Sequence, residues 1–408
     1  MKAIVYHGIG EIALEEVPEP KIKEPTDAIV RITASAICGT DLHFLRGTFP
    51  GVKKGRILGH EAVGVVEEVG KAVRNLRRGD RVVVPSTVGC GACNYCRAGY
   101  QSQCDRANPN GPHAGTVFFG GPEKAGGLDG LQAEFARIPF AAANLVKLPD
   151  EITDDQAILM SDILPTSYMA AVMAEIKPSD TVAIYGCGPV GLFAIACAQH
   201  LGATRVFAVD SVPTRLEMAQ RHGAEVINFN QEDPAAVLQE LTNGAGPDRV
   251  IDAVGIDAAP ATDGPAAKKS AKEPNEKELK NIASEGTPKG KAFQPGGAPF
   301  QALRWAIESV AKAGTVSVIG VYSGPSLNFP IEMVMEKNLT LKAGNCNHRR
   351  YMPEMIELVR TGAIRPEQFL TQKRALLSAV EAYRAFDRHE DGWIKVELDP
   401  AGAGQKAA

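Results

Sequence analysis

The sequence predicts an α/β protein of two domains, and three observations lead to this prediction. The chain has 408 residues, more than the roughly 250–300 that a single hydrophobic core usually organises. Its second half alternates short β-branched runs with helical segments, a pattern typical of a doubly wound parallel sheet. In that half the motif Gly186-x-Gly188-x-x-Gly191 joins a strand to a helix, as in a Rossmann fold that binds a dinucleotide.

Composition and charge argue against several classes of protein. Hydrophobic residues make up 44% of the chain and charged residues 23%, and the formal net charge is −4. This balance favours neither a nucleic acid nor an anionic membrane as partner. The N-terminus lacks the apolar core of a signal peptide, and the longest apolar run, residues 183–198, is too short to span a bilayer. We therefore expect a cytoplasmic protein, in which disulfides are rare.

Two short segments near the N-terminus carry candidate metal ligands. Cys38 lies in AICGTDLHFLRG (residues 36–47) and His60 in ILGHEAVGVVEEVG (residues 57–70), each beside a glycine that lets the backbone approach closely. A catalytic zinc site keeps three protein ligands and leaves the fourth position for water or substrate. Cys38 and His60 would supply two of these, so the third must come from elsewhere in the chain. Taken alone, the pair fits a buried free cysteine at least as well.

Four of the eight cysteines fall within a short glycine-rich loop. Cys90, Cys93, Cys96 and Cys104 have the spacing C-x2-C-x2-C-x7-C. Four thiolates so spaced can surround one ion tetrahedrally and leave no open position, which is typical of structural zinc. An iron–sulfur cluster and four unliganded thiols are the alternatives. A ferredoxin run would continue with three residues and Cys-Pro, which this chain does not have.

The glycine motif has the spacing that a dinucleotide requires. Gly186 turns tightly, Gly188 lets the backbone approach the pyrophosphate, and Gly191 allows the helix to pack on the strand. The helix is expected to run to about residue 200. Its first residues, Pro189 and Val190, then face the phosphates beside free N–H groups.

A second predicted strand, residues 205–209, ends at Asp210. An acid about 20 residues after the glycine motif accepts hydrogen bonds from the adenosine ribose and repels a 2′-phosphate, which favours NAD over NADP. Arg215 works in the opposite sense, because a nearby arginine can accommodate that phosphate. Cys187, inside the turn, is interpreted as a small apolar residue. Further strands are predicted at residues 225–228, 249–254, 315–319 and 340–343.

Residues 257–300 interrupt the alternation of strands and helices. This segment is rich in Ala, Pro, Gly and Lys and has almost no large apolar residues, so we expect much of it to bury no core. It leaves the carboxyl edge of the sheet, where the cofactor is expected. Two interpretations stay open: a solvated insertion, or a flap that covers the adenosine half of NAD and slows its release.

Four features occur in one order along the chain: Cys38-Gly-Thr-Asp-x-His43, Gly59-His60-Glu61, the four-cysteine cluster and the glycine motif. Together they resemble the zinc-containing medium-chain alcohol dehydrogenase family, and the resemblance spans nearly the whole chain. It implies a GroES-like, β-rich, zinc-binding catalytic domain of residues 1–164 and 347–408. It also implies a Rossmann domain of residues 165–346, which contains the insertion, and an active-site cleft between the two domains.

The resemblance implies that Cys38 and His60 bind catalytic zinc. Where many members have a third cysteine ligand, this chain has Asp162 in SDILPTSY, a wording that resembles the branch of glutathione-independent formaldehyde dehydrogenases and dismutases. A carboxylate keeps the ligand anionic but harder, so Asp162 can complete a zinc site; a helix cap or turn residue is the alternative. Glu61 is implied to coordinate zinc transiently, and Asp41 is a candidate acceptor for the other ring N–H of His60.

The expected reaction is reversible hydride transfer between an alcohol and NAD, giving an aldehyde or ketone, in an enzyme with zinc at both sites. Thr40 would accept the hydrogen bond of the alcohol and His43 would relay its proton through the cofactor ribose. A satisfied turn hydroxyl and a surface imidazole are the respective alternatives. Two other functions stay open: a formaldehyde dehydrogenase or aldehyde dismutase with tightly bound NAD, and a non-catalytic nucleotide-binding protein. The expected partners are a small alcohol or aldehyde and, by the resemblance, further copies of the chain in a homodimer or homotetramer.

Overall fold

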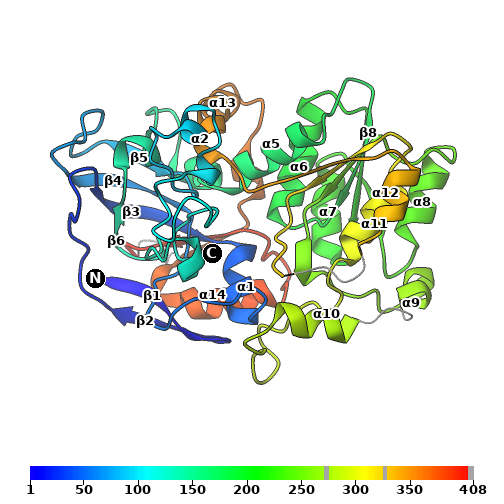
Figure 1. Cartoon of the computed structure of the whole chain (residues 1–408), viewed down its shortest axis with the longest axis horizontal. Helices are drawn as coiled ribbons and strands as arrows, with labels where there is room; N and C mark the ends of the chain where they lie inside the picture. The colour runs from blue at the N-terminus through cyan, green and yellow to red at the C-terminus, as the bar shows by residue number, and fades with distance from the viewer. Residues whose placement is uncertain (271–274, 325–328, 403–408) are drawn as a thin grey trace.

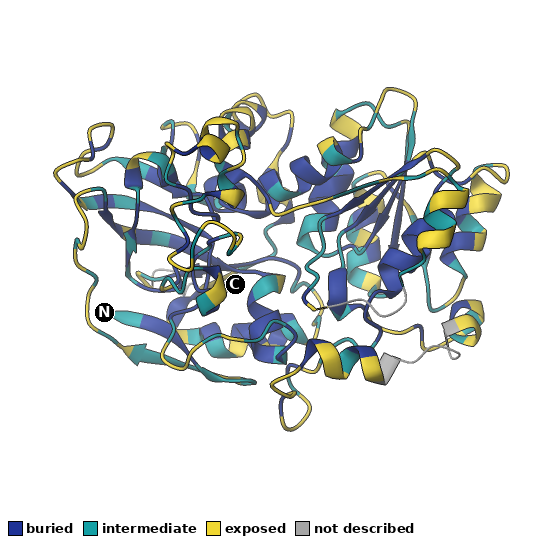
Figure 2. Ribbon diagram, in the orientation of Figure 1, coloured by how far each residue is buried: buried dark blue, intermediate teal, exposed yellow. Residues whose placement is uncertain are grey.

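The polypeptide folds around two β-sheets that lie side by side in the computed structural model, which describes residues 1–270, 275–324 and 329–402 (Figure 1). The sheet on the left of Figure 1 contains strands from both ends of the chain, and the sheet on the right contains the strands between them. Buried residues follow the strands and the helix sides that face them, as Figure 2 shows. Among the described residues, no helix is both long enough and apolar enough to cross a membrane.

The first sheet is mostly antiparallel and has β3 at its centre. β3 (Ala28–Ile37) pairs with β4 (Ala62–Val69), β6 (Phe135–Ile138) and β15 (Val396–Asp399). β15 therefore returns the chain to the first sheet after the second sheet is complete, as the sequence predicts. The predicted boundaries at residues 164/165 and 346/347 stay a prediction. The remaining strands of this lobe are β1 (Lys2–Gly8), β2 (Glu11–Glu16), β5 (Arg81–Val84), β7 (Val146–Lys147) and β14 (Gln372–Ala375).

The second sheet is parallel, with the strand order β10-β9-β8-β11-β12-β13. Successive side chains of a strand face opposite sides of the sheet. In β8, Ala183 and Tyr185 therefore pack with α8 and α11, whereas Val182 and Ile184 pack with α5 and α6. Helices thus cover both faces, which is the doubly wound arrangement that the sequence predicts. The strands are β8 (Thr181–Tyr185), β9 (Arg205–Asp210), β10 (Glu225–Asn228), β11 (Arg249–Asp252), β12 (Thr315–Val318) and β13 (Thr340–Ala343).

The helices differ in how far they are buried: α6 is buried over most of its length, whereas no residue of α12 is buried. α6 begins with Pro189 at its first position, where a missing N–H costs no hydrogen bond, and its apolar side chains are buried between the second sheet and α5. The helices are α1 (Gly39–Arg46), α2 (Asn94–Arg97), α3 (Ala141–Asn144), α4 (Asp154–Met160), α5 (Ile163–Met173), α6 (Pro189–His200), α7 (Pro213–Arg221), α8 (Pro234–Leu241), α9 (Gly264–Ser270), α10 (Asn275–Ile282), α11 (Gln301–Ser309), α12 (Ile331–Glu336), α13 (His348–Arg360) and α14 (Ala379–Asp387).

The predicted strands of the second sheet agree with the structure to within one residue, except at the end of β11. β10 and β13 have the predicted bounds, and α6 ends at residue 200 as expected. β11 was expected to reach Val254 but ends at Asp252. The Asp252 carboxylate accepts hydrogen bonds from the backbone N–H groups of Val254 (2.9 Å) and Gly255 (3.3 Å), and this turn replaces the next strand residues.

The insertion at residues 257–300 is largely exposed, as expected, but it also contributes buried apolar residues. Phe293 packs in the core cluster that holds β1, α1 and α14 of the first lobe. Ile282, at the end of α10, packs with Ile256 and Phe300. The insertion therefore leaves the second lobe, contacts the first lobe beneath α1 and α14, and returns (Figure 1). These buried residues are the exceptions in a segment of which much was expected to bury no core.

Candidate metal and dinucleotide site

One cavity of about 760 Å³ is lined by residues of both lobes. Cys38, His60 and Asp162 line it, and so do Gly188 and Asp210. The candidate metal ligands and the candidate dinucleotide site therefore share a single cavity, in the cleft where the sequence places the active site. In the second sheet this cavity lies where β8 has β9 on one side and β11 on the other, so the order of the strands reverses there.

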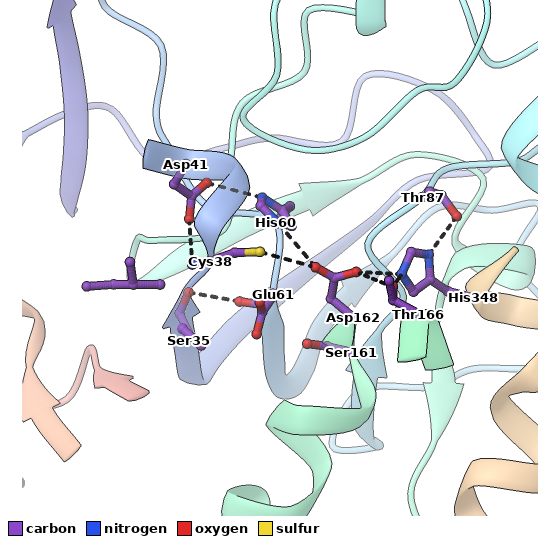
Figure 3. Close-up of polar contacts among 12 residues, drawn as sticks. Ser35, Cys38, Asp41, His60, Glu61, Thr87, Ser161, Asp162, Thr166 and His348 are labelled. Carbon is purple, nitrogen blue, oxygen red and sulfur yellow. Dashed lines mark hydrogen bonds and ion pairs between the residues drawn. The ribbon is translucent and has the colours of Figure 1, made fainter. Parts of the chain in front are cut away.

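Three loops bring the first group of candidate ligands together (Figure 3). Cys38 lies between β3 and α1, His60 precedes β4, and Asp162 precedes α5. The Cys38 Sγ lies 3.6 Å from Asp162 Oδ2, and the His60 Nε2 lies 3.3 Å from the same oxygen. Together with a carboxylate oxygen of Glu61, these ligand atoms lie within 4.8 Å of one another. The Cys38 sulfur is a soft donor, the His60 nitrogen is borderline and the carboxylate oxygens are hard. A set of such donors at this separation fits a zinc ion.

Asp162 occupies the N-cap position of α5, but its side chain makes no capping hydrogen bond. Oδ2 faces Cys38 and His60 instead. Oδ1 lies 2.6 Å from His348 Nε2 and accepts a hydrogen bond from the Thr166 hydroxyl at 3.0 Å. Although burial opposes its ionisation, hydrogen bonds from His348 and His60 hold the pKa of Asp162 well below its usual value. The structure therefore does not support the interpretation of Asp162 as a simple helix cap.

Asp41 orients the His60 ring through Nδ1, the nitrogen that faces away from Asp162. Its Nδ1 lies 3.1 Å from Asp41 Oδ1, and Asp41 also accepts a hydrogen bond from the Cys38 backbone N–H (3.1 Å). Asp41 is fully buried, so its carboxylate lies inside the protein beside the His60 ring. With Nδ1 directed to Asp41, Nε2 is the nitrogen left for a metal. Burial raises the pKa of the Cys38 thiol, and a cation at this point would favour the thiolate.

Glu61 has a partner that the sequence did not reveal. The Lys395 Nζ donates hydrogen bonds to both Glu61 carboxylate oxygens, at 2.7 and 2.6 Å, and to the Ile37 carbonyl at 3.1 Å. Both charged side chains are fully buried. The ion pair joins the loop before β4 to the residue before β15, so it fixes the Glu61 carboxylate beside the candidate metal ligands. A lysine inside the apolar run WIKVEL is the signal that could have identified it.

His348 is the second residue that sequence reasoning left without a role. It begins α13, and its Nδ1 lies 3.0 Å from the Thr87 hydroxyl while its Nε2 faces Asp162 (Figure 3). Its side chain is buried and lines the cavity. His348 therefore holds the Asp162 carboxylate from the side opposite Cys38 and His60.

The four-cysteine cluster forms a second compact group. The ligand atoms of Cys90, Cys93, Cys96 and Cys104 lie within 4.8 Å of one another. Backbone N–H groups point at the sulfurs: that of Cys93 donates to Cys90 Sγ at 3.3 Å, and that of Cys90 donates to Cys104 Sγ at 3.2 Å. Against the effect of burial, backbone donors lower the pKa of Cys93 to about 7. Burial raises the pKa of Cys96 and of Cys104 instead. The convergence of the four sulfurs, with no open position among them, is what fits a closed, four-coordinate zinc ion.

The glycine motif has the geometry that its sequence predicts. Gly186 has a φ of +90°, which a side chain rarely tolerates. A Cβ on Gly191 would lie 1.7 Å from the Gly186 carbonyl oxygen, so helix and strand approach too closely for any other residue. A Cβ on Gly188 would meet nothing within 4 Å, because this glycine faces the cavity that it lines. Pro189 and Val190, at the start of α6, line the same cavity.

Asp210 and Arg215 both line the cavity, as the dinucleotide prediction requires. The Asp210 carboxylate accepts hydrogen bonds from the backbone N–H groups of Cys187 (2.7 Å), Ser211 (2.7 Å) and Val212 (2.9 Å). These donors fix the carboxylate at the end of β9. Cys187 is fully buried and burial raises its pKa well above the usual range, which agrees with its interpretation as an apolar residue.

The two candidate relay residues lie on α1. Thr40 and His43 both line the cavity. His43 is 5% exposed, so it is not the surface imidazole that was the alternative. Its Nδ1 lies 2.8 Å from an oxygen of Asp257, the first residue of the insertion. Nothing in the sequence pattern joined these two residues, which lie in different lobes.

One zinc-type ligand group that shares a cavity with a Rossmann-type glycine motif, and a separate group of four cysteines, define a class: the zinc-dependent medium-chain dehydrogenases, which are oxidoreductases. Comparison with known proteins gives the family. Residues 24–150 match the model of the alcohol dehydrogenase GroES-like domain, and residues 189–263 match that of the zinc-binding dehydrogenases. The zinc-type alcohol dehydrogenase-like protein AdhB of Bacillus subtilis (strain 168) is 38% identical over 404 residues, which cover 98% of this chain and 100% of that protein. The chain therefore belongs to the zinc-type alcohol dehydrogenase family.

Two further matches bear on the fold and the branch. The solved structure of the alcohol dehydrogenase TADH from Thermus sp. ATN1 is 36% identical, has a TM-score of 0.79 and covers 98% of this chain and 99% of its own. The glutathione-independent formaldehyde dehydrogenase of Pseudomonas aeruginosa (strain LESB58) is 38% identical over 270 residues, which cover 63% of this chain and 66% of that protein. These matches confirm the predicted α/β fold with a GroES-like and a Rossmann domain, and they confirm the resemblance to zinc-containing medium-chain alcohol dehydrogenases.

Proposed function

We propose that this protein is a zinc-dependent alcohol dehydrogenase that transfers hydride reversibly between an alcohol and NAD. The observation that carries the proposal is the position of the Cys38, His60 and Asp162 ligand atoms in the cavity that also contains Gly188 and Asp210. A protein that only binds a nucleotide needs no such group of donors beside it. That arrangement therefore favours the enzyme over a non-catalytic nucleotide-binding protein.

In the proposed enzyme each residue has a defined task. When bound, zinc acidifies the alcohol and NAD accepts the hydride. Cys38, His60 and Asp162 hold the metal, and Asp41 and His348 hold two of these ligands in place through the contacts given above. Glu61, fixed by Lys395, is available as a transient ligand.

The proton of the alcohol needs a path out of a cavity whose walls are largely buried. Thr40 lies on the cavity wall, where it would accept the hydroxyl hydrogen bond, and His43 lies on the same wall, where it would take up the released proton. The imidazole suits this task because its ordinary pKa lies near neutrality.

The proposed cofactor is NAD rather than NADP. The Asp210 carboxylate is buried at the end of β9 and fixed by backbone donors, so a 2′-phosphate there would meet a carboxylate that cannot turn away. Arg215 lines the same cavity and would favour the phosphate. The ratio of kcat/KM for the two cofactors measures which residue dominates, and we expect NAD to be preferred.

The test combines zinc content with activity. We expect wild-type protein to hold one zinc ion in each of its two ligand groups and to reduce NAD with a panel of primary and secondary alcohols. Cys38→Ser should lose one zinc ion per chain and lose activity to background, whereas the structural zinc stays. Wild-type protein with both zinc ions but no activity on any alcohol or aldehyde would contradict the proposal.

A second candidate is a glutathione-independent formaldehyde dehydrogenase or aldehyde dismutase that keeps NAD bound. Asp162 in place of a cysteine and the match to the Pseudomonas aeruginosa protein favour this branch. In addition, the insertion begins at the cavity, which Asp257, Ala258 and Ala259 line. One experiment separates the two candidates: freshly purified protein is denatured, and the nicotinamide nucleotide that it releases is measured. About one nucleotide per chain favours the dismutase, and almost none favours exchangeable NAD.

We also propose a cytoplasmic location and a homodimer or homotetramer. None of the eight cysteines, all of which lie in the described residues, forms a disulfide, and this suits a reducing compartment. β13 is the last strand of the second sheet and its residues are partly exposed, so it can pair with a second chain. Light scattering during size-exclusion chromatography measures the assembly.

A further inference from the structure

His43 is held by a buried group of charges that joins the two lobes. Its Nδ1 lies 2.8 Å from Asp257 Oδ2 and 3.0 Å from the Thr48 hydroxyl. Arg46 Nη1 lies 3.1 Å from the same Asp257 oxygen, and Arg46 also pairs with Asp387 of α14 at 2.8 Å. The side chains of His43, Arg46, Asp257 and Asp387 are only 6–11% exposed.

These contacts determine which nitrogen of His43 carries the proton. Burial opposes the ionisation of Asp257, but His43 and Arg46 hold its pKa far below the usual value, so it is an acceptor only. The Thr48 hydroxyl has two acceptors for its own proton, Asp257 Oδ2 at 3.3 Å and the His43 carbonyl oxygen at 3.5 Å, so its oxygen can accept a hydrogen bond from His43 Nδ1. Two acceptors beside Nδ1 require a proton on that nitrogen. A neutral His43 therefore keeps Nε2 free as a base.

We propose that Asp257, contributed by the insertion of the NAD-binding lobe, is a positioning residue for the proton relay: it fixes the tautomer and orientation of His43. The inference rests on the proposed function for its effect on turnover. This role differs from that of a flap over the adenosine half of NAD. Asp257 acts across the cleft, on His43 in α1 of the other lobe.

The position of Asp257 depends on how the insertion contacts the first lobe. The Phe293 backbone N–H donates a hydrogen bond to Asp387 Oδ2 at 2.7 Å, and Phe293 itself is buried in the core of the first lobe. Asp387 is the residue that holds Arg46, and Arg46 holds Asp257. Asp257 therefore contacts Arg46 directly, and Phe293 contacts it through Asp387. His43 has the Asp257 carboxylate as its acceptor only when the two lobes are in contact.

The first test is a double-mutant cycle on turnover. Asp257→Asn keeps the shape of the side chain but removes its charge, and His43→Gln removes the relay. We expect each single substitution to lower kcat, by about tenfold for Asp257→Asn and about a hundredfold for His43→Gln. The double variant should be no slower than His43→Gln alone, because Asp257 acts through His43. If Asp257→Asn slows the His43→Gln enzyme by the same tenfold, the proposal is wrong and Asp257 is merely structural.

Asp387→Asn is the matched control, because it removes the other carboxylate on Arg46 without touching His43. The charged groups that face His43 are Asp257 from the insertion and Arg46 on its own helix, with Asp387 behind Arg46. Loss of the Asp257 charge disfavours the imidazolium, so the acidic limb of the kcat profile should move to lower pH by about one unit. In Asp387→Asn the Asp257 carboxylate remains beside His43 Nδ1, so the limb should move clearly less than in Asp257→Asn, and an equal shift would overturn the proposal.

A second measurement does not depend on catalysis. NMR chemical shifts of the two ring nitrogens report the tautomer, and the His43 signals are those lost in His43→Gln. In zinc-loaded wild-type protein we expect the proton on Nδ1, and a mixture of tautomers in Asp257→Ala. An unchanged tautomer in Asp257→Ala refutes the proposal. If the expected tautomers are found but no alcohol is oxidised, the proposed function fails while the positioning of His43 stands.

Discussion

Replacement of Lys395 by methionine tests the buried ion pair beside the candidate zinc ligands. Lys395 and Glu61 are both fully buried, and the Nζ lies 2.7 and 2.6 Å from the two carboxylate oxygens. At an effective dielectric constant of about 20, opposite charges at this separation attract by about 6 kcal/mol. Methionine nearly preserves the side-chain volume but leaves Glu61 buried without its cation.

The expected cost follows from that uncompensated charge. Removal of one partner of a buried ion pair costs about 3–5 kcal/mol of unfolding free energy. Lys342→Met is the matched control, because its ion pair with Glu175 has a similar length, 2.5 Å, but side chains that are 38% and 48% exposed. We expect that control to cost less than about 1 kcal/mol.

The assay is unfolding by urea at a fixed zinc concentration, because bound metal itself stabilises the folded state. Two probes, far-ultraviolet circular dichroism and tryptophan fluorescence, should give coincident transitions before a free energy is extracted. The double variant Lys395→Met, Glu61→Gln should be less destabilised than the sum of the single variants, because the buried charge is then gone. If Lys395→Met costs no more than Lys342→Met, the pair does not hold the site together and this reasoning is refuted.

Three further predictions follow from the geometry. Gly191→Ala places a Cβ 1.7 Å from a backbone oxygen, so we expect a lower Tm and loss of NAD binding, measured by calorimetry. Cys104→Ser opens the four-cysteine group; zinc analysis should find one ion fewer per chain, and the Tm should fall while the catalytic zinc stays. Burial and the neighbouring Arg215 lower the pKa of His389 to about 3. Its neutral form therefore contributes stability that is lost as the pH falls from about 6.5 towards 3. His389→Asn, which suits the local φ of +52°, should make this loss shallower by up to about 1.4 kcal/mol per pH unit.

The sequence was most informative where local spacing and periodicity decide the structure. The glycine motif, the ends of β10 and β13 and the four-cysteine group each lie within a short pattern whose spacing has a clear physical requirement. Cys38, His60 and Asp162 are far apart in the sequence, and only the resemblance to a known family joined them. β11 ended two residues early because the side chain of Asp252 competes for backbone donors, and strand propensity carries no information about such competition.

The residues that sequence reasoning missed make contacts across long separations. Lys395 meets Glu61 across 334 positions and His348 meets Asp162 across 186. Asp257 reaches His43 only because the insertion contacts the first lobe. No periodicity predicts such pairs, since each depends on how the two lobes pack. A single lysine, histidine or aspartate in an otherwise ordinary segment has no local reason to be singled out.

The return of β15 to the first sheet has a consequence for synthesis on the ribosome. The four-cysteine loop is complete once residue 104 has emerged, so it can capture its metal early. Glu61 has no cation until Lys395 is made, and β3 has an open edge until β15 pairs with it. Through most of translation the nascent first lobe therefore lacks the cation of Glu61, and residues 35–37 of β3 lack the partner that β15 supplies. The ion pair between Glu61 and Lys395 can form only after residue 395 has left the ribosome.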